Sequence, residues 1–148
     1  GGVRAITLDK DDEVVSMELD STGERELLVM TKKGFGKRTS LDEYRLQTRG
    51  GKGVSTYDKT KFSKTGELVG ATLVSKDDEI MLINSNGVII RIRANEISKS
   101  GRTTQGVKIM KVESGDEIVS FAKVLDEDDA SKPMTKKEKA DSEQMTLV

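Results

Sequence analysis

The sequence of 148 residues has no cysteine, no histidine, no tryptophan and a single proline, and aromatic residues make up only 3% of it. Without cysteine, disulfides and thiolate metal sites are excluded; without histidine, so are most zinc sites and all Ser-His or Cys-His nucleophiles. No apolar run approaches the roughly 20 residues of a membrane-spanning helix, and no signal segment opens the chain. These absences predict a soluble cytoplasmic module with no catalytic residues, metal or cofactor of its own and no membrane partner.

Apolar and charged residues each make up 34% of the chain, so the hydrophobic core must be thin. A typical domain is about 45–50% apolar when glycine is included. We therefore expect burial to be spread thinly, or part of the chain to stay unfolded. The sequence opens Gly1-Gly2 without an initiating methionine, and we expect it to be a piece of a longer protein. In isolation we expect it to be a monomer.

The net charge of −1 hides a segregation of charge along the chain. Residues 31–61 carry nine basic and three acidic residues, a net charge of +6, and residues 88–112 have a net charge of +5. Acidic residues dominate segments 7–27 and 113–148, with net charges of −6 and −5. Because fields and counterion release are local effects, each basic zone can gather a polyanion although the whole chain is nearly neutral. A solvated surface of mixed charge is the alternative interpretation.

The sequence repeats itself at a spacing of 53 residues. Residues 26–34 (ELLVMTKKG) align without a gap with residues 79–87 (EIMLINSNG). The same offset pairs arginines and glycines further along: Arg38 with Arg91, Arg49 with Arg102, and Gly53 with Gly106. A third copy of the end of the unit opens the chain at residues 2–6, and its beginning recurs at residues 12–17. A period near 50 residues is typical of propeller blades and related arrays.

Each unit has the pattern of short β-strands. In the second unit, Asn86-Gly87 separates two apolar runs, which is a strong hairpin signal, and Lys33-Gly34 takes this place in the first unit. After each hairpin comes a segment that fits a turn or a single helical turn, at residues 40–44 and 94–97. A loop and a strand that begins with Gly-Val then close the unit. About four strands per unit is the number in a propeller blade.

These patterns divide the chain in two. Residues 1–125 are predicted to form an all-β, propeller-like array, since long helical periodicity occurs nowhere in them. Residues 126–148 begin with an acidic cluster and continue with lysines and the only proline. Such a segment cannot bury enough apolar surface to offset the entropy of ordering, so we predict a disordered tail.

The most informative loop, the glycine-rich loop, spans residues 44–53 (YRLQTRGGKG). Glycines at three of its last four positions allow positive φ angles and close approach of backbone N–H groups to an anion. Its cations, which can neutralise phosphates, are Arg45, Arg49 and Lys52. The second unit has residues 100–106 (SGRTTQG) here, which keep the arginine and last glycine and add threonine hydroxyls that can donate to phosphate oxygens. A glycine-rich turn with solvated bases is the alternative.

Three runs of the sequence carry a resemblance to a known family: residues 34–39 (GFGKRT), 43–54 (EYRLQTRGGKGV) and 101–107 (GRTTQGV). They closely resemble the C-terminal domain of the A subunit of bacterial DNA gyrase, over roughly residues 1–125. The resemblance implies a β-pinwheel, a six-bladed, propeller-like disc whose basic rim wraps duplex DNA. It also implies that this chain is the last part of such a disc, with about two full blades and strands of their neighbours.

The resemblance implies roles for individual residues. The glycine-rich loop matches the family's Gln-Arg-Arg-Gly-Gly-Lys-Gly box, except that Thr48 stands where the family has a basic residue. Phosphates would be held in this loop by Arg45, Gln47, Arg49, Gly50, Gly51, Lys52 and Gly53. The phosphate track would continue through Lys37 and Arg38 in the first unit and through Arg91, Arg93, Arg102 and Lys108 in the second. Contacts of this kind position duplex DNA without reading its sequence, so binding should depend steeply on salt.

The resemblance further implies that the chain is not an enzyme by itself. It would belong to an ATP-dependent type IIA topoisomerase, whose catalytic tyrosine, ATP and Mg²⁺ sites lie elsewhere, in other parts of the gyrase A protein and in the gyrase B protein. The domain would bend DNA around its rim with a positive crossing, and passage of that segment through the break would give negative supercoils. Duplex DNA, the rest of the A protein and the B protein are thus the expected partners, in the bacterial cytoplasm and nucleoid.

Two alternatives stay open at this point. The first is the C-terminal domain of the A subunit of topoisomerase IV, a degenerate pinwheel that recognises DNA crossings; the clean run at residues 47–53 argues against it. The second is a propeller-like protein-interaction module, which would explain the repeats and the thin core. It predicts that substitution of Arg49 and Lys52 leaves DNA affinity unchanged.

Overall fold

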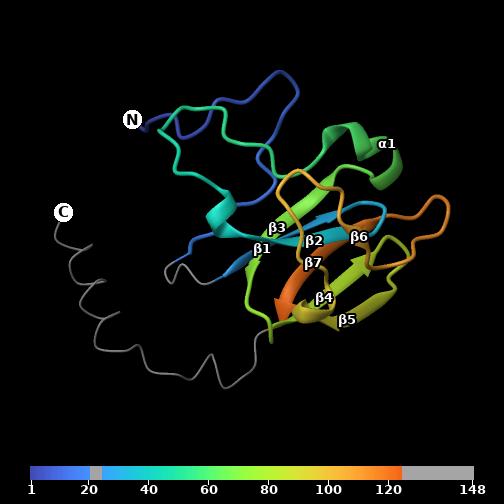
Figure 1. The fold of residues 1–148 in the computed structure, drawn as a ribbon. Coiled ribbons are helices and arrows are strands. Elements are labelled where there is room, and N and C mark those ends of the chain that lie inside the picture. Colours follow the sequence, from blue (N-terminus) through green and yellow to red (C-terminus); the bar gives the residue numbers. More distant parts are fainter. Residues whose placement is uncertain (21–24, 125–148) are drawn as a thin grey trace.

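A computed structural model of the chain describes residues 1–20 and 25–124. Its regular structure is mainly two antiparallel sheets, each built around the hairpin of one repeat (Figure 1). The all-β prediction is therefore confirmed. The predicted disordered tail at residues 126–148 lies outside the described residues.

The first sheet has four strands in the order β3-β1-β2-β6: β1 (Glu26–Thr31), β2 (Phe35–Ser40), β3 (Leu68–Val74) and β6 (Val107–Lys108). The β1–β2 hairpin turns at Lys33-Gly34 as predicted, and Gly34 has a φ of 80°. The outermost strand, β6, comes from the second repeat and pairs with the beginning of β2, where Gly36 lies opposite Val107. The two repeats are thus joined by an exchanged strand.

The second sheet has three strands in the order β5-β4-β7: β4 (Glu79–Asn84), β5 (Ile89–Arg93) and β7 (Ile118–Val124). The predicted turn at Asn86-Gly87 joins β4 to β5. The prediction of about four strands per unit holds for the first sheet. The described second sheet has three, because β6 of the second repeat lies in the first sheet.

Two short helical turns, η1 (Leu41–Glu43) and η3 (Ala94–Glu96), agree with the segments predicted after each hairpin. Two more, η2 (Lys59–Lys61) and α1 (Phe62–Thr65), precede β3 and were not predicted. Asp58 begins η2 by accepting a hydrogen bond at 3.0 Å from the Thr60 backbone N–H. Within residues 1–20 and 25–124, no helix has the length and hydropathy needed to cross a membrane.

The core lies between the two sheets. Leu28 and Met30 of β1 pack with Ile80 and Leu82 of β4, and Ile97 closes the core after η3. Alternation along each strand puts these aliphatic side chains on the inner face of its sheet. In the second sheet, more buried residues alternate with more exposed ones along β4 and β5, whereas nearly every residue of β1 and β2 is buried, so the first sheet is covered on both faces.

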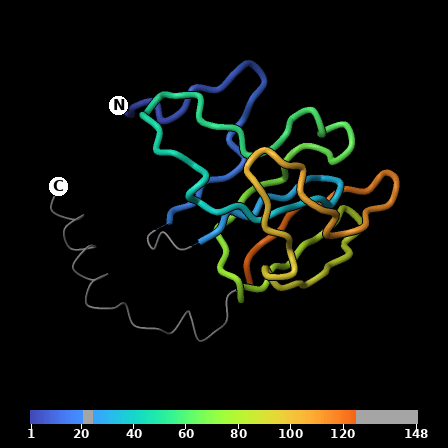
Figure 2. Tube along the Cα trace, viewed as in Figure 1, coloured from blue at the N-terminus to red at the C-terminus, as the bar shows by residue number. Residues whose placement is uncertain are grey.

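Residues 1–20 differ from the prediction, because no strand forms at the copies of the repeat at residues 2–6 and 12–17. The copy at 12–17 corresponds to β3 and β7, each of which pairs with the hairpin that precedes it in the chain. Residues 1–11 form no such hairpin, so this copy has no strand to pair with. Figure 2 shows the beginning of this segment beside the glycine-rich loop. Further along, the Ser16 hydroxyl accepts a hydrogen bond at 3.1 Å from the backbone N–H of Ala71 in β3. The strand predicted to begin at Gly53-Val54 is also absent.

Candidate nucleic-acid interface

The glycine-rich loop follows η1 at the carboxyl end of β2 and extends away from the sheets (Figure 1). Its predicted side chains Arg45, Gln47, Arg49 and Lys52 are all exposed. Gly50 and Gly53 have φ angles of 76° and 79°, a conformation that residues with a Cβ rarely adopt. The glycines thus set the path of the loop, and its cations face the solvent.

The amino-terminal segment fixes the middle of this loop. The backbone N–H of Gly50 donates to the carbonyl of Ala5 at 2.9 Å, and the N–H of Thr7 donates to the carbonyl of Gly51 at 2.9 Å. At the end of the loop, the Lys52 ammonium pairs with the Asp9 carboxylate at 2.6 Å. Their hydrogen bond and charge attraction lower the pKa of Asp9 and raise that of Lys52. Both side chains are largely exposed, so the pair can open to an incoming anion.

Lys37 does not have the exposed position that its predicted role requires, because its side chain is fully buried. Its ammonium donates to the carbonyls of Gly101 at 2.8 Å and Arg102 at 2.5 Å, and lies 5.6 Å from the ring centroid of Tyr57. Burial lowers the pKa of Lys37 to about 8. The prediction that Lys37 contacts phosphate is therefore corrected: this lysine ties β2 to the loop at residues 97–106, here called the second loop.

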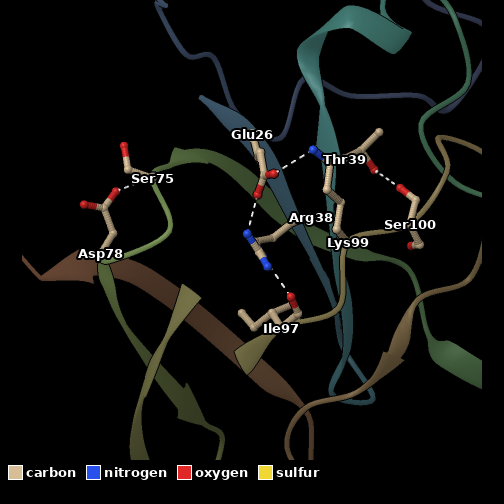
Figure 3. A network of polar contacts seen from close by, with 8 residues as sticks. All are labelled: Glu26, Arg38, Thr39, Ser75, Asp78, Ile97, Lys99 and Ser100. Carbon is tan, nitrogen blue, oxygen red and sulfur yellow. Dashed lines mark hydrogen bonds and ion pairs between the residues drawn. The ribbon is translucent and has the colours of Figure 1, made fainter. Parts of the chain in front are cut away.

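Arg38 is also buried, with 7% of its surface exposed. Figure 3 shows its guanidinium between the Glu26 carboxylate and the carbonyl of Ile97, which accepts from Nε at 2.8 Å. Lys99 reaches the other oxygen of Glu26 at 2.9 Å. These bonds join β1 and β2 to the second loop, so Arg38 is likewise removed from the predicted phosphate track.

The second loop is held against the first sheet along its length. The backbone N–H of Ser100 donates to the carbonyl of Arg38 at 2.9 Å, and the Thr39 hydroxyl donates to the carbonyl of Ser100 at 3.0 Å. Arg102, expected to contact phosphate, is half-buried, and its guanidinium donates to the carbonyl of Ser55. The expected role of Arg102 is thus weakened by its protein contacts.

The three remaining predicted cations lie on exposed positions of the outer strands. Arg91 and Arg93 are on β5, and Lys108 is on β6. Arg91 forms an ion pair with Glu79 on the neighbouring strand, and about half of its side chain stays exposed. The structure thus does not gather all the predicted cations in one place. Lys33 and Lys64 are exposed cations outside the predicted set, although the basic zone that begins at residue 31 could have indicated Lys33.

The described residues contain no group of three or more acidic side chains that could hold a metal ion. What they do offer is a set of exposed guanidinium and ammonium groups on the glycine-rich loop. Such groups can bind phosphates along a polyanion. The predicted phosphate contacts of the Gly50 and Gly51 N–H groups are corrected, because these groups donate to the carbonyls of Ala5 and Thr48.

Comparison with known proteins places this geometry in a family. Residues 1–19, 25–75 and 78–124 match the family model described as the DNA gyrase C-terminal domain, beta-propeller. The chain belongs to this family. The A subunit of DNA gyrase from Staphylococcus epidermidis is 43% identical over 129 residues, and that from Mycolicibacterium smegmatis is 40% identical over 136 residues. These alignments cover 86% and 90% of the chain, yet only 14% and 16% of the relatives, so the chain spans about a seventh of their length.

Two solved structures resemble the fold of this gyrase-family domain. A DNA gyrase A C-terminal domain is 31% identical, with a TM-score of 0.64 over 68% of this chain and 33% of its own. The C-terminal domain of a DNA topoisomerase IV is 25% identical, with a TM-score of 0.77 over 97% of this chain and 43% of its own. The pinwheel fold predicted from the resemblance is confirmed.

Proposed function

We propose that this chain binds the backbone of duplex DNA and holds it in a bend, as the DNA-contacting module of a gyrase A protein. The observation that carries the proposal is the glycine-rich loop, whose Arg45, Arg49 and Lys52 are exposed, while Lys37 and Arg38 of the same unit are buried. Membership of the gyrase family supports it.

Binding would run through phosphate oxygens. Arginine guanidiniums and lysine ammoniums of the loop would contact successive phosphates, and Gly50 and Gly51, which have no side chains, would let the duplex approach the loop closely. Gln47 and Gly53 complete this set, and Arg91, Arg93 and Lys108 would continue the track on the second unit. With about six phosphates engaged, the slope of log K against log salt would be about −5.

The module would do no chemistry of its own. DNA cleavage by a tyrosine and the use of ATP and Mg²⁺ would belong to other parts of the enzyme, in the rest of the A protein and in the B protein. This chain would contribute by constraining a DNA segment for passage through the break, in the bacterial cytoplasm. A bend of positive handedness would make the net result negative supercoiling.

Topoisomerase IV stays the second candidate, favoured by the higher TM-score of its C-terminal domain. Sequence identity argues against it, since the chain is 43% identical to an A subunit of gyrase and 25% identical to this topoisomerase IV domain. The two functions differ in topology: a gyrase-type domain wraps DNA, whereas a domain that recognises crossings binds without constraining a wrap.

Salt titration of DNA binding tests the proposal. We would compare the chain with a double variant, Arg45→Gln and Arg49→Gln, by fluorescence anisotropy on a labelled duplex. Loss of two phosphate contacts should lower the magnitude of the slope by about 1.8. The control is Lys76→Gln, which removes an exposed positive charge between β3 and β4. Equal slopes for wild type and the double variant would overturn the proposed role of the loop.

A further inference from the structure

A cluster of lysines lies at the end of β2 opposite to the glycine-rich loop. Lys33 is in the β1–β2 turn, Lys64 is on α1, and Lys108 is on β6. In Figure 1, α1 and the β1–β2 turn lie at the other end of the first sheet from η1. Three different elements thus bring positive charge to one place.

The aromatic ring of Phe35 organises this cluster. The Lys108 ammonium lies 5.3 Å and the Lys64 ammonium 5.9 Å from the ring centroid, within the range of cation–π attraction. Lys33 donates to the carbonyl of Ser63 at 2.7 Å, which ties the turn to α1. The ammonium groups are therefore held near one another before any ligand arrives, and like charges kept this close favour a bound anion.

The cluster borders a hollow of about 270 Å³. Two carboxylates, from Glu113 and Asp116, line the same hollow. That of Asp116 already accepts hydrogen bonds from the Asn86 amide at 2.6 Å and the Ser85 hydroxyl at 3.3 Å. One of the two acidic groups is thus engaged with the β4–β5 turn, and the three lysines outnumber the acids.

The second unit has no such cluster. Asn86 stands at the position of Lys33, Val88 at that of Phe35, and, aligned through β3 and β7, Ser114 at that of Lys64. Among the described residues, the lysines thus gather only at the first sheet, to which the second repeat contributes Lys108 through β6, and they are not needed to form the repeat. This difference indicates a function other than folding.

We propose that Lys33, Lys64 and Lys108 form a second phosphate-binding cluster, which contacts the same duplex as the glycine-rich loop. The inference rests on the proposed function. The six residues of β2 span about 20 Å at about 3.3 Å per residue. Duplex DNA carries about one phosphate charge per 1.7 Å of its axis, so a duplex running past the molecule in the direction of β2 presents about twelve phosphates over this distance and can contact both ends.

The test is salt titration of duplex binding with single lysine variants. Lys64→Gln should lower the magnitude of the salt slope by about 0.9, the value for one phosphate contact. Lys33→Gln combined with Lys64→Gln should lower it by about twice as much. Lys64→Arg keeps the charge and should retain the wild-type slope. The matched control is Lys76→Gln, which removes the same charge from an exposed turn outside the cluster.

The outcomes separate this inference from the proposed function. If Lys64→Gln keeps the wild-type salt slope while the slope of the Arg45→Gln, Arg49→Gln variant falls in magnitude, the cluster inference is overturned and the glycine-rich loop keeps its proposed role. If wild type shows no salt-dependent DNA binding, both fail. A reduced slope for Lys64→Gln, restored in Lys64→Arg and absent in Lys76→Gln, supports the cluster.

Discussion

Two ion pairs occupy equivalent positions in the two repeats, yet their surroundings differ. The Glu26–Arg38 pair of the first sheet leaves only 11% and 8% of its side chains exposed. In the Glu79–Arg91 pair of the second sheet, 31% and 55% are exposed. The second loop covers the first pair, and no such loop covers the second among the described residues.

The comparison extends to the loops themselves. The second loop lies against β2, where its glycine, Gly106, comes so close that a Cβ would lie 2.3 Å from the carbonyl oxygen of Gly36. At Gly53, the equivalent glycine of the glycine-rich loop, a Cβ would meet nothing within 4 Å. The second loop thus packs against the first sheet, whereas the glycine-rich loop, at the equivalent position of the first repeat, presents its cations to the solvent.

The ion pairs should differ most in their contribution to stability. Arg38→Met leaves the buried Glu26 carboxylate with Lys99 as its cation partner and removes the donor to the Ile97 carbonyl. Loss of one partner of a buried pair costs about 3–5 kcal/mol, and because Lys99 remains we expect the lower end, about 3 kcal/mol of the free energy of unfolding. Exposed pairs contribute about 0–1 kcal/mol, which is the loss expected for Arg91→Met. Urea denaturation followed by circular dichroism measures both. Equal losses would contradict the distinction between covered and open pairs.

Alanine substitution of Gly53 and Gly106 should separate the glycine-rich loop from the second loop by their effect on stability. Both have positive φ, which costs a residue with a Cβ about 1–2 kcal/mol. Gly53→Ala should cost no more than this. Gly106→Ala must also move β2 or the second loop, and we expect a total loss of about 3 kcal/mol. Thermal unfolding of the two variants side by side would show the difference; a Gly53→Ala variant as unstable as Gly106→Ala would refute it.

The buried lysine should make stability depend on pH. With the pKa of Lys37 lowered to about 8, the unfolded chain holds a proton between pH 8 and about 10.5 that the folded chain has lost. The free energy of unfolding of the wild type should therefore rise with pH in this window, relative to Lys37→Met. Urea denaturation at pH 7, 8, 9 and 10 gives this difference. A difference that falls or stays constant would show that the lysine is not buried as described.

The smallest expected effect is on DNA affinity and concerns the glycine-rich loop. Asp9→Asn removes the partner of Lys52 and should tighten DNA binding by about twofold, because surface pairs contribute little. Anisotropy at low salt measures the change, and Asp11→Asn, at an exposed neighbouring position, is the control. Weaker binding by Asp9→Asn would indicate that the pair organises the loop for DNA.

Much of the fold was predictable from the sequence because its signals are local. The Asn86-Gly87 turn and the apolar runs beside it predict the β4–β5 hairpin without knowledge of distant contacts. The burial of Lys37 and Arg38 was not predictable in this way. A lysine and an arginine on a strand read as surface cations, and only contact with residues 97–102, about 60 positions away, buries them. The exposure of the glycine-rich loop was predictable from its glycines and cations. The exchange of β6 between the repeats was not, because it depends on tertiary packing.

The most direct test of the central claim, that the open cations bend DNA, is ligation of nicked circular DNA in the presence of the chain. The linking number of the product reports any wrap that the protein constrains. We predict a positive shift that grows with protein concentration and is lost in the Arg45→Gln, Arg49→Gln variant. An unchanged linking number at saturating, salt-sensitive binding would contradict the account and would indicate a module that holds DNA without wrapping it.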